Sequence, residues 1–411
     1  MKIAHIAPPW IAVPPKNYGG TEIVIHHLVE EQVALGHDVT LFAPGDAQAS
    51  AKLVSFFPKS LIDTGVPWPA HLKAFYHYYK SVEFIKTHRF DIVHAHLSSS
   101  SDMYIFPLSV HLATPLIATI HSRFPFDRVG EWTGNADQYY LEWMRSVPLV
   151  AISKNACDDV PYFLDIVGVV HHGLPMAPFI PTMPEDFFLW LGRITADKGT
   201  HLAIQAAREA GVPLVLAGTV DKHVEEAVQY FEELIKPQID GQQITYIGPV
   251  DMQQKTDLLR RARCLLNPIQ WEEPFGMVMI EAMALGCPVI SFARGSAPEI
   301  VAHRTSGFLV HDLHEMVHYI ARVDELDRAT VRAYAEQHFS VRAMAEKYFT
   351  IYRKVMVTSL TEPALSSSVM TPVLVRTPLK TFPVPAGETM IALDSTVQTT
   401  RKKVEVEQNM N

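Results

Sequence analysis

Short apolar runs alternate with longer, partly polar stretches along most of the chain, and the runs have the length of β-strands. In the first half we predict strands at residues 3–7, 39–43, 92–95, 116–120, 149–152 and 167–170. In the second half we predict strands at residues 187–191, 214–217, 244–247, 264–269 and 289–293. Because the stretches between them have helical length and composition, the pattern predicts an α/β protein with parallel sheets.

The alternation falls into two parts, separated by a proline-rich segment that has no hydrophobic period. We predict two Rossmann-like domains, residues 1–173 and 185–340, joined by a hinge at residues 174–184. The composition then shifts to Ser, Thr, Pro and Val, so residues 360–411 are predicted to form a disordered tail. A chain of 411 residues, 48% of them hydrophobic, can bury two cores.

Charge and cysteine content exclude several classes of protein. The net charge of -9 argues against nucleic acid as a general partner. Cys157, Cys264 and Cys287 lie far apart without metal-ligand spacing, which predicts a reduced, cytoplasmic protein rather than a disulfide scaffold. No apolar run reaches the roughly 18 residues of a membrane span, and the N-terminus has the pattern of a strand, so we expect a soluble or peripheral protein.

Two carboxylates, Glu273 and Glu281, border the start of a predicted helix at residues 277–285. Because a strand precedes this helix, its N-terminus would point free backbone N–H groups into the crevice at the strand ends, where phosphate binds. Acidic groups repel a phosphate, which indicates that these carboxylates hydrogen-bond hydroxyl groups instead. A sugar nucleotide carries both phosphates and hydroxyls.

Two cations, Arg193 and Lys198, follow the first strand of the second half. A guanidinium can clamp two phosphate oxygens and an ammonium supplies a compact charge, so together they could neutralise a diphosphate. No Asp-x-Asp triplet occurs in the sequence. We therefore expect these cations and the helix dipole to bind the phosphates, with no essential metal ion and no cofactor.

The first half supplies further candidates. Gly19 and Gly20 end a proline-rich loop and precede Thr21, a plausible helix cap, and glycines there would let backbone N–H groups approach a ligand. His121 follows the strand at residues 116–120, at the carboxyl end where site residues gather. The dinucleotide fingerprint G-x-G-x-x-G is absent, which disfavours a nicotinamide enzyme.

The segment from Glu273 to Glu281 matches the Glu-x7-Glu signature of retaining GT-B glycosyltransferases, and the chain resembles glycosyltransferase family 4. Further matches fall in that family's order, at residues 190–199 (WLGRITADKG), 214–218 (LVLAG), 246–250 (YIGPV) and 295–300 (GSAPEI), with Gly19-Gly20 and residues 119–122 (TIHS) in the first half. The resemblance covers roughly residues 1–356. It implies the GT-B fold, in which two Rossmann-like domains face a central cleft, and a helix at residues 341–356 that returns to the first domain.

The same resemblance implies transfer of a sugar from a nucleoside-diphosphate sugar to a hydroxyl of an acceptor, with retention at the anomeric carbon. The first domain would face the acceptor and the second would bind the donor. Glu273 would hold hydroxyls of the donor sugar, Glu281 the ribose, and His121 the transferred sugar. Arg193, Lys198 and the N–H groups near Phe275 and Gly276 would stabilise the leaving diphosphate; the other predicted donor-binding residues are Gly19, Gly20, Gly192 and Val250. A front-face attack, in which the leaving phosphate accepts the acceptor's proton, is implied as well.

Two other functions fit the same motifs less well. One is another GT-B enzyme, such as a sugar-nucleotide epimerase or a phosphorylase, and the other is a non-catalytic sugar-nucleotide-binding protein. The sequence identifies neither the acceptor nor the base of the donor. A membrane could also be a partner, because lysines are interleaved with an apolar stripe at helical spacing, but we favour a core-facing helix for Leu72, Phe75, Tyr79, Val82 and Ile85.

Overall fold

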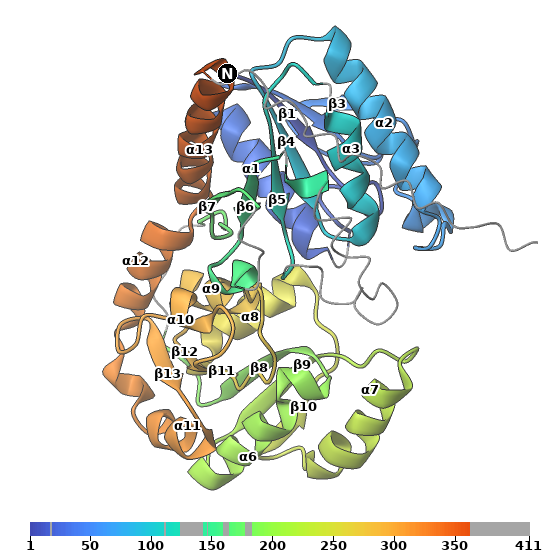
Figure 1. The fold of residues 1–411 in the computed structure, drawn as a ribbon. Helices are drawn as coiled ribbons and strands as arrows, with labels where there is room; N and C mark the ends of the chain where they lie inside the picture. The colour runs from blue at the N-terminus through green and yellow to red at the C-terminus, as the bar shows by residue number, and fades with distance from the viewer. Residues whose placement is uncertain are drawn as a thin grey trace, which may run out of the picture. The chain divides into compact units, whose positions relative to one another are not determined.

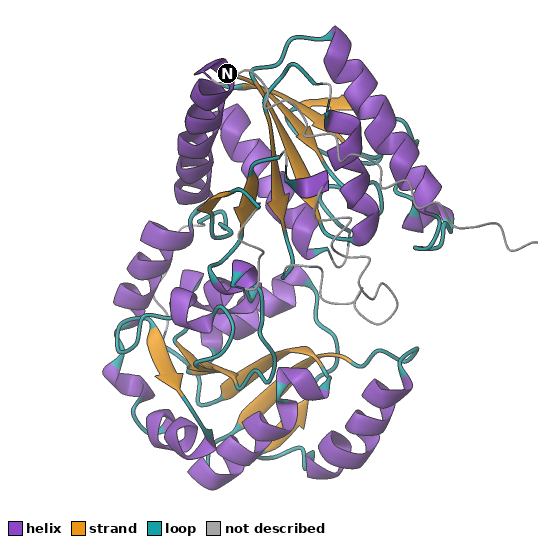
Figure 2. Ribbon diagram, viewed as in Figure 1, coloured by secondary structure: helices purple, strands orange, loops and turns teal. Residues whose placement is uncertain are grey.

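The structure, a computed structural model of the chain, describes residues 1–16, 19–110, 112–123, 143–145, 147–158, 164–176 and 183–361. All of these residues lie in one compact unit, Met1–Ala364. Two parallel β-sheets with helices packed on them make up this unit (Figures 1 and 2). The predicted tail, residues 360–411, lies outside the described residues from residue 362 onward.

The first sheet has seven parallel strands in the order β3-β2-β1-β4-β5-β6-β7. Its strands are β1 Lys2–Ile6, β2 Asp38–Phe42, β3 Lys52–Val54, β4 Ile92–Leu97, β5 Leu116–Ile120, β6 Leu149–Ala151 and β7 Ile166–Val169. The described helices of this part are α1 Gly20–Ala34, α2 His71–Thr87 and α3 Ile105–Ser109. Because all the strands run the same way, their carboxyl ends lie along one edge of the sheet, where ligands bind in such folds.

The second sheet has six parallel strands in the order β10-β9-β8-β11-β12-β13. Its strands are β8 Phe188–Arg193, β9 Leu214–Thr219, β10 Ile244–Tyr246, β11 Cys264–Asn267, β12 Val289–Phe292 and β13 Gly307–Val310. Its helices are α6 Thr200–Ala210, α7 Glu225–Tyr230, α8 Met252–Arg261, α9 Met277–Ala284, α10 Ala297–Ile300, α11 Leu313–Ile320 and α12 Arg328–Phe339. The chain ends its described part in α13, Val341–Thr361.

All the predicted strands are confirmed, with ends that differ by at most two residues. Two strands were not predicted, β3 and β13. Both lie at the edges of their sheets and have only three and four residues, so they carry too little of an alternating pattern to be detected.

The two faces of the first sheet pack against different helices. Ala4 and Ile6 of β1 lie in a core with residues of α2, whereas Ile3 lies in a core with residues of α1 and α13. Successive side chains of a strand point to opposite faces, which explains this division. Figure 1 shows α13 alongside α1, and Tyr348 and Tyr352 of α13 are fully buried in the shared core.

The chain passes between the part built on the first sheet and the part built on the second near Leu174 and again near residues 339–341. These two segments lie side by side. The N–H of Leu174 donates to the carbonyl of Phe339, and the N–H of Val341 donates to the carbonyl of Leu174. The middle of the predicted hinge, residues 177–182, lies outside the described residues. The proposed domain boundaries therefore stay a prediction.

The buried stripe of α2 is not the predicted one. Val82 and Ile85 are buried as expected, but Leu72 is 80% exposed and Tyr79 is 43% exposed. The stripe is instead formed by Ala74, His77, Tyr78, Ser81, Val82 and Ile85. The prediction counted only large apolar side chains, whereas the small or polar residues Ala74, His77 and Ser81 also lie on the buried face. No helix among the described residues has both the length and the apolar character needed to cross a lipid bilayer.

Candidate active site

The loop at residues 273–276, which we call the Glu273 loop, joins β11 to α9. Gly276 forms the N-cap of α9 at φ +77°, and a Cβ there would lie 2.6 Å from Cε of Met279. Gly295 approaches the loop so closely that a side chain at this position would overlap the loop backbone. The N–H of Ser296 donates to the carbonyl of Glu273 over 2.9 Å. Glycines at these two positions thus allow a loop that is tightly held at the start of a helix.

Glu273 forms a mostly buried ion pair with Lys198. Lys198 ends a 3₁₀ turn, Ala196–Lys198, that follows β8, and its ammonium donates to Oε2 of Glu273. Nε1 of Trp271 donates to the same oxygen over 3.1 Å, and the ammonium lies 5.0 Å from the indole ring centroid. The sequence predicted that Lys198 binds phosphate and Glu273 binds hydroxyls. The structure brings both side chains to one point, where each neutralises the other.

Glu281 forms a second ion pair of the same kind. It is the fifth residue of α9, about one turn into the helix as predicted, and Nζ of Lys255 on α8 lies 2.7 Å from its Oε1. Both side chains are mostly buried. Sequence reasoning missed Lys255, because a lysine on an otherwise polar helix has the pattern of a solvated surface residue.

Arg193 and Gly192 lie at the carboxyl end of β8, which is the strand beside β11. Arg193 is exposed, and its guanidinium forms no hydrogen bond or ion pair with a described residue. Gly192 approaches Gly218 of β9 so closely that a Cβ on Gly218 would overlap the Gly192 carbonyl. Val250 is half-buried against the core of the second sheet. The guanidinium of Arg193 is therefore available to an anion at this edge of the sheet.

His121 lies at the carboxyl end of β5 and reaches the Glu273 loop through a neighbouring histidine. The backbone N–H of His121 donates to the carbonyl of Leu97 over 2.8 Å. Its ring stacks on His172 at a centroid distance of 5.2 Å, and the His172 ring lies 4.6 Å from that of Phe275. Burial lowers the pKa of His121 to about 3, so the imidazole is neutral at physiological pH.

Gly19 and Gly20 occupy the start of α1. Gly19 is the N-cap and Gly20 is the first helical residue, so the helix begins before Thr21 and the predicted cap at Thr21 is wrong. A Cβ on Gly19 would lie 2.7 Å from Oε2 of Glu22, whereas Gly20 is exposed beside open space. No hydrogen bond or ring contact among the described residues ties either glycine to the Glu273 loop.

Glu22 was not predicted as a site residue, although it directly follows the predicted glycines. Its side chain is buried in the first turn of α1. Burial raises its pKa from 4.5 to about 7, and the nearby Asp102 contributes in the same direction, while the hydrogen bond with its own backbone lowers it. Glu22 is thus a titratable group next to the glycine pair.

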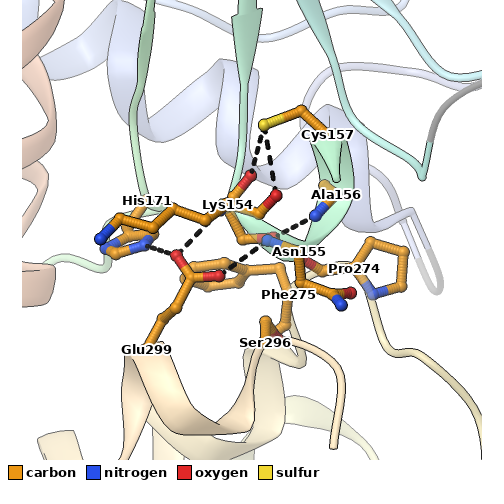
Figure 3. Close-up of polar contacts among 10 residues, drawn as sticks. Lys154, Asn155, Ala156, Cys157, His171, Pro274, Phe275, Ser296 and Glu299 are labelled. Atoms are coloured by element: carbon orange, nitrogen blue, oxygen red, sulfur yellow. Dashed lines mark hydrogen bonds and ion pairs between the residues drawn. The ribbon is translucent and has the colours of Figure 1, made fainter. Parts of the chain in front are cut away.

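Beside the Glu273 loop, Glu299 of α10 connects the part of the protein built on the second sheet with the part built on the first (Figure 3). Its Oε2 accepts hydrogen bonds from the N–H of Lys154 over 2.8 Å and from Nε2 of His171 over 3.0 Å, and its Oε1 accepts from the N–H of Asn155 over 2.9 Å. Next to it, Oγ of Ser153 donates to the carbonyl of Pro274 over 2.6 Å. These four contacts, which we call the Glu299 latch, join the segments after β6 and β7 to α10 and the loop.

The electrostatics of the latch favour an ionised carboxylate. Burial raises the pKa of Glu299, but the hydrogen bonds from His171, Lys154 and Asn155 outweigh burial and bring the pKa below its ordinary value of 4.5. Glu299 stood within a motif that the sequence revealed, residues 295–300, yet nothing in the sequence indicated its partners. They come from a segment more than 120 residues away along the chain.

Comparison with known proteins agrees with this geometry. Residues 18–161 match the family described as Glycosyltransferase Family 4, and residues 179–337 match Glycosyl transferases group 1. The spore coat protein SA of Bacillus subtilis (strain 168) is 23% identical over 399 residues, which are 86% of this chain and 100% of that protein. The alpha-1,3/1,6-mannosyltransferase ALG2 of Homo sapiens is 33% identical over 200 residues, 43% of this chain and 47% of the human protein.

A solved structure shows the same architecture. The Anabaena protein Alr3699/HepE, in complex with UDP and glucose, is 17% identical with a TM-score of 0.64, over 86% of this chain and 100% of that one. Two parallel sheets, with carboxylates and lysines gathered where β11 passes into α9, define a glycosyltransferase of the GT-B fold. The chain belongs to glycosyltransferase family 4.

Proposed function

We propose that this glycosyltransferase moves a sugar from a nucleoside-diphosphate sugar to a hydroxyl of an acceptor, with retention of the anomeric configuration and without a metal ion. The main support for this proposal is the two Lys–Glu ion pairs, Lys198–Glu273 at the Glu273 loop and Lys255–Glu281 on α9. Glu273 precedes the N-terminus of α9 and Glu281 is the fifth residue of that helix, and each carboxylate is paired with one ammonium group. A ligand that carries both hydroxyls and phosphates matches this set of groups. The UDP and glucose in the Anabaena structure support this donor class.

In this proposal the donor rearranges the ion pairs when it binds. The diphosphate competes with Glu273 for Lys198, and the Glu273 carboxylate that is released accepts hydrogen bonds from hydroxyls of the donor sugar. Arg193, whose guanidinium has no partner among the described residues, contributes the second cation. The first-turn N–H groups of α9 add donors that lack partners within the helix. Glu281 holds the ribose hydroxyls, with Lys255 fixing its carboxylate.

The bond changes can then proceed on one face of the sugar. The bond between the anomeric carbon and the leaving phosphate oxygen breaks, and negative charge develops on the diphosphate. The acceptor hydroxyl forms the new bond from the same face, and its proton passes to the departing phosphate oxygen. Lys198, Arg193 and the helix N-terminus stabilise the developing charge, which is the main catalytic demand of such a reaction.

A panel of UDP-, GDP- and ADP-sugars tests the proposal, with release of the nucleoside diphosphate measured in the presence and absence of candidate acceptors. We expect one donor to be consumed, faster with acceptor, at a rate that EDTA does not change. Proton NMR of the product should show the anomeric configuration of the donor. An inverted product would contradict retention. An epimerase would convert the donor sugar without needing an acceptor, and a purely binding protein would consume no donor.

A further inference from the structure

The face of the first sheet that packs on α1 and α13 changes character along its strands. At the amino ends the side chains are apolar, and toward the carboxyl ends they are polar and buried, although they belong to the same face. Period-two alternation puts three sets of residues on it: Ile3 and His5 of β1, Ile92, His94 and His96 of β4, and Ile117, Thr119 and the following His121 of β5. The polar ends therefore form a cluster of histidines next to the active site.

Three of these histidines form one hydrogen-bonded chain that starts on α1. The side-chain carbonyl of Gln32 lies 2.8 Å from Nε2 of His5, and Nδ1 of His5 lies 2.9 Å from Nε2 of His96. Nδ1 of His96 lies 2.9 Å from Nε2 of His121. Gln32, His5 and His96 are each fully buried. The chain thus runs through the buried interior on this face of the sheet, from α1 across β1 and β4 to His121, a predicted site residue.

The orientation of Gln32 sets the direction of every bond in the chain. Its amide nitrogen donates to the hydroxyl of Tyr352 over 3.2 Å, so its carbonyl faces His5. Nε2 of His5 must then carry a proton, which leaves Nδ1 of a neutral ring to accept from Nε2 of His96. By the same step His96 accepts at Nδ1 from Nε2 of His121. His121 ends the chain with an unprotonated Nδ1, which is buried and has no partner among the described residues.

This direction of the hydrogen bonds requires neutral imidazole rings, and burial keeps the three rings neutral. Burial lowers the pKa of His5 to about 4, although the Gln32 hydrogen bond opposes this, and lowers the pKa of His121 to about 3. The pKa of His96 falls well below its ordinary value, first because of burial and then because of the neighbouring His94 and His121. Each ring therefore carries one proton and can donate from one nitrogen only.

The nitrogen atoms of His5, His94 and His96 are also close enough together to suggest a metal site. Their hydrogen bonds favour the chain instead. His94 uses Nδ1 for the hydroxyl of Tyr352 and Nε2 for that of Thr119, each over 2.7 Å. Because both nitrogens of His5 and His96 are engaged as well, a metal ion would have to break bonds that are already made.

We propose that Gln32, His5 and His96 are positioning residues that hold His121 as the Nε2–H tautomer, so that its Nδ1 accepts a hydrogen bond from a substrate hydroxyl. Naming the hydroxyl rests on the proposed function, whereas the tautomer rests on the hydrogen bonds alone. A nitrogen that can only accept attracts a hydroxyl proton and repels phosphate oxygens. The His121 ring stacks on His172, and the His172 ring contacts Phe275, so this preference acts one side chain away from the Glu273 loop.

Nitrogen-15 NMR of the unmodified protein with labelled histidine tests the tautomer directly. The His121 signals are assigned by their loss in His121→Gln. We expect a neutral ring at pH 7 with the proton on Nε2 and an unprotonated Nδ1. A proton on Nδ1 would mean that the chain runs in the opposite direction, and an imidazolium at pH 7 would mean that it does not control His121 at all. Either result overturns the inference without any reference to activity.

Breaking the chain at its far end tests the positioning role. Gln32→Leu removes the acceptor for His5, so the His121 tautomers should mix, and turnover should fall roughly three- to tenfold while the affinity for the free nucleoside diphosphate stays unchanged. His77→Gln is the control, because His77 is a buried histidine that bonds the carbonyl of Ala7 outside the chain.

The outcomes separate the inference from the proposed function. An unchanged His121 tautomer in folded Gln32→Leu, or an equal effect of His77→Gln, contradicts the positioning chain; thermal denaturation shows whether each variant folds. If the wild-type tautomer is as expected but no sugar nucleotide is consumed, the chain stands and the proposed function fails.

Discussion

Glu22 illustrates how one buried side chain couples stability to pH. Its folded-state pKa of about 7 lies above the ordinary value of 4.5, so the folded protein binds this proton more tightly than the unfolded chain does. Below pH 4.5 the Glu22 carboxyl is protonated in both the folded and the unfolded protein and does not affect stability. As the pH rises from 4.5 to about 7, only the unfolded chain ionises this group readily, so the folded protein loses stability. The shift of about 2.5 units corresponds to on the order of 3 kcal/mol above pH 7.

We predict that Glu22→Gln is more stable than the wild type at pH 8 and that this advantage disappears near pH 4.5. Thermal denaturation of both proteins at several pH values measures the difference. Glu226→Gln is the control, because Glu226 also lies in the first turn of a helix but is exposed. Parallel stability curves for Glu22→Gln and wild type would show that Glu22 is ionised in the folded protein at neutral pH.

The sequence revealed the site's residues better than it revealed their partners. Glu273 and Glu281 stand out because their spacing around a strand-to-helix junction is local information. Lys255 and Glu299 could not be assigned in this way, because their contacts join elements that are 26 and more than 120 residues apart. The roles given to Arg193, Gly192 and Val250 stay predictions, because nothing in their geometry distinguishes donor contacts from exposed or packed positions.

The turn from the Glu273 loop into α9 is an element whose geometry should matter for both stability and binding. Gly276 has φ +77°, and a Cβ there would lie 2.6 Å from Cε of Met279 and 3.4 Å from Cγ of Glu273. Gly211, which ends α6, has φ +68° but no atom within 4 Å of such a Cβ. The two positions thus share the backbone strain of a substitution and differ in the contacts it would make.

We predict that Gly276→Ala and Gly211→Ala each lose about 1–2 kcal/mol of folding free energy, because alanine is strained in the left-handed region. Only Gly276→Ala should also weaken nucleoside-diphosphate binding, because it pushes on Met279 and the Glu273 loop. Denaturant unfolding and calorimetric titration measure the two effects. Equal binding by both folded variants would mean that the loop's geometry does not affect the donor site.

Elements were predicted well where burial gave a clear period and poorly where it did not. The central strands are mostly apolar because helices cover both faces of the sheets, so the sequence shows these strands plainly. The short edge strands β3 and β13 lack this signal. The face of α2 was misjudged by about one position, because Ala74 and Ser81 pack on the sheet while Leu72 lies in solvent. A pattern of large apolar side chains does not reveal the small and polar residues, such as Ala74, His77 and Ser81, that share this buried face.

The Glu299 latch joins the parts of the molecule built on the two sheets. Its carboxylate has a pKa below 4.5 because the donors from Lys154, Asn155 and His171 outweigh the effect of burial. The latch thus stabilises the fold above pH 4.5, where the unfolded carboxyl is ionised, and this stabilisation is lost as the pH falls through the lowered folded-state pKa.

We predict that Glu299→Gln costs about 1–3 kcal/mol at pH 7, because a neutral amide accepts these hydrogen bonds less strongly, and that the cost shrinks at pH values below 4.5. Hydrogen exchange at the amides of Lys154 and Asn155 should become faster in the variant. Glu232→Gln, which breaks an exposed pair with Lys236, is the control and should change neither quantity measurably. Unchanged exchange at both amides would show that the latch does not hold this segment.

The division of labour between the two carboxylates of the second half is the centre of the proposed mechanism. A free nucleoside diphosphate contains ribose but no transferred sugar, so it separates the two roles. Glu281→Ala should weaken its binding on the order of ten- to a hundredfold, the value of a lost charge-assisted hydrogen bond of roughly 1.5–3 kcal/mol. Glu273→Ala should leave the affinity nearly unchanged while lowering the rate of transfer.

Calorimetric titration of both folded variants with the nucleoside diphosphate of the preferred donor therefore distinguishes the two roles. We predict a large loss of affinity for Glu281→Ala and little or none for Glu273→Ala. Equal losses in the two variants, or no loss for Glu281→Ala, would contradict the assignment of ribose to Glu281 and of the donor sugar to Glu273.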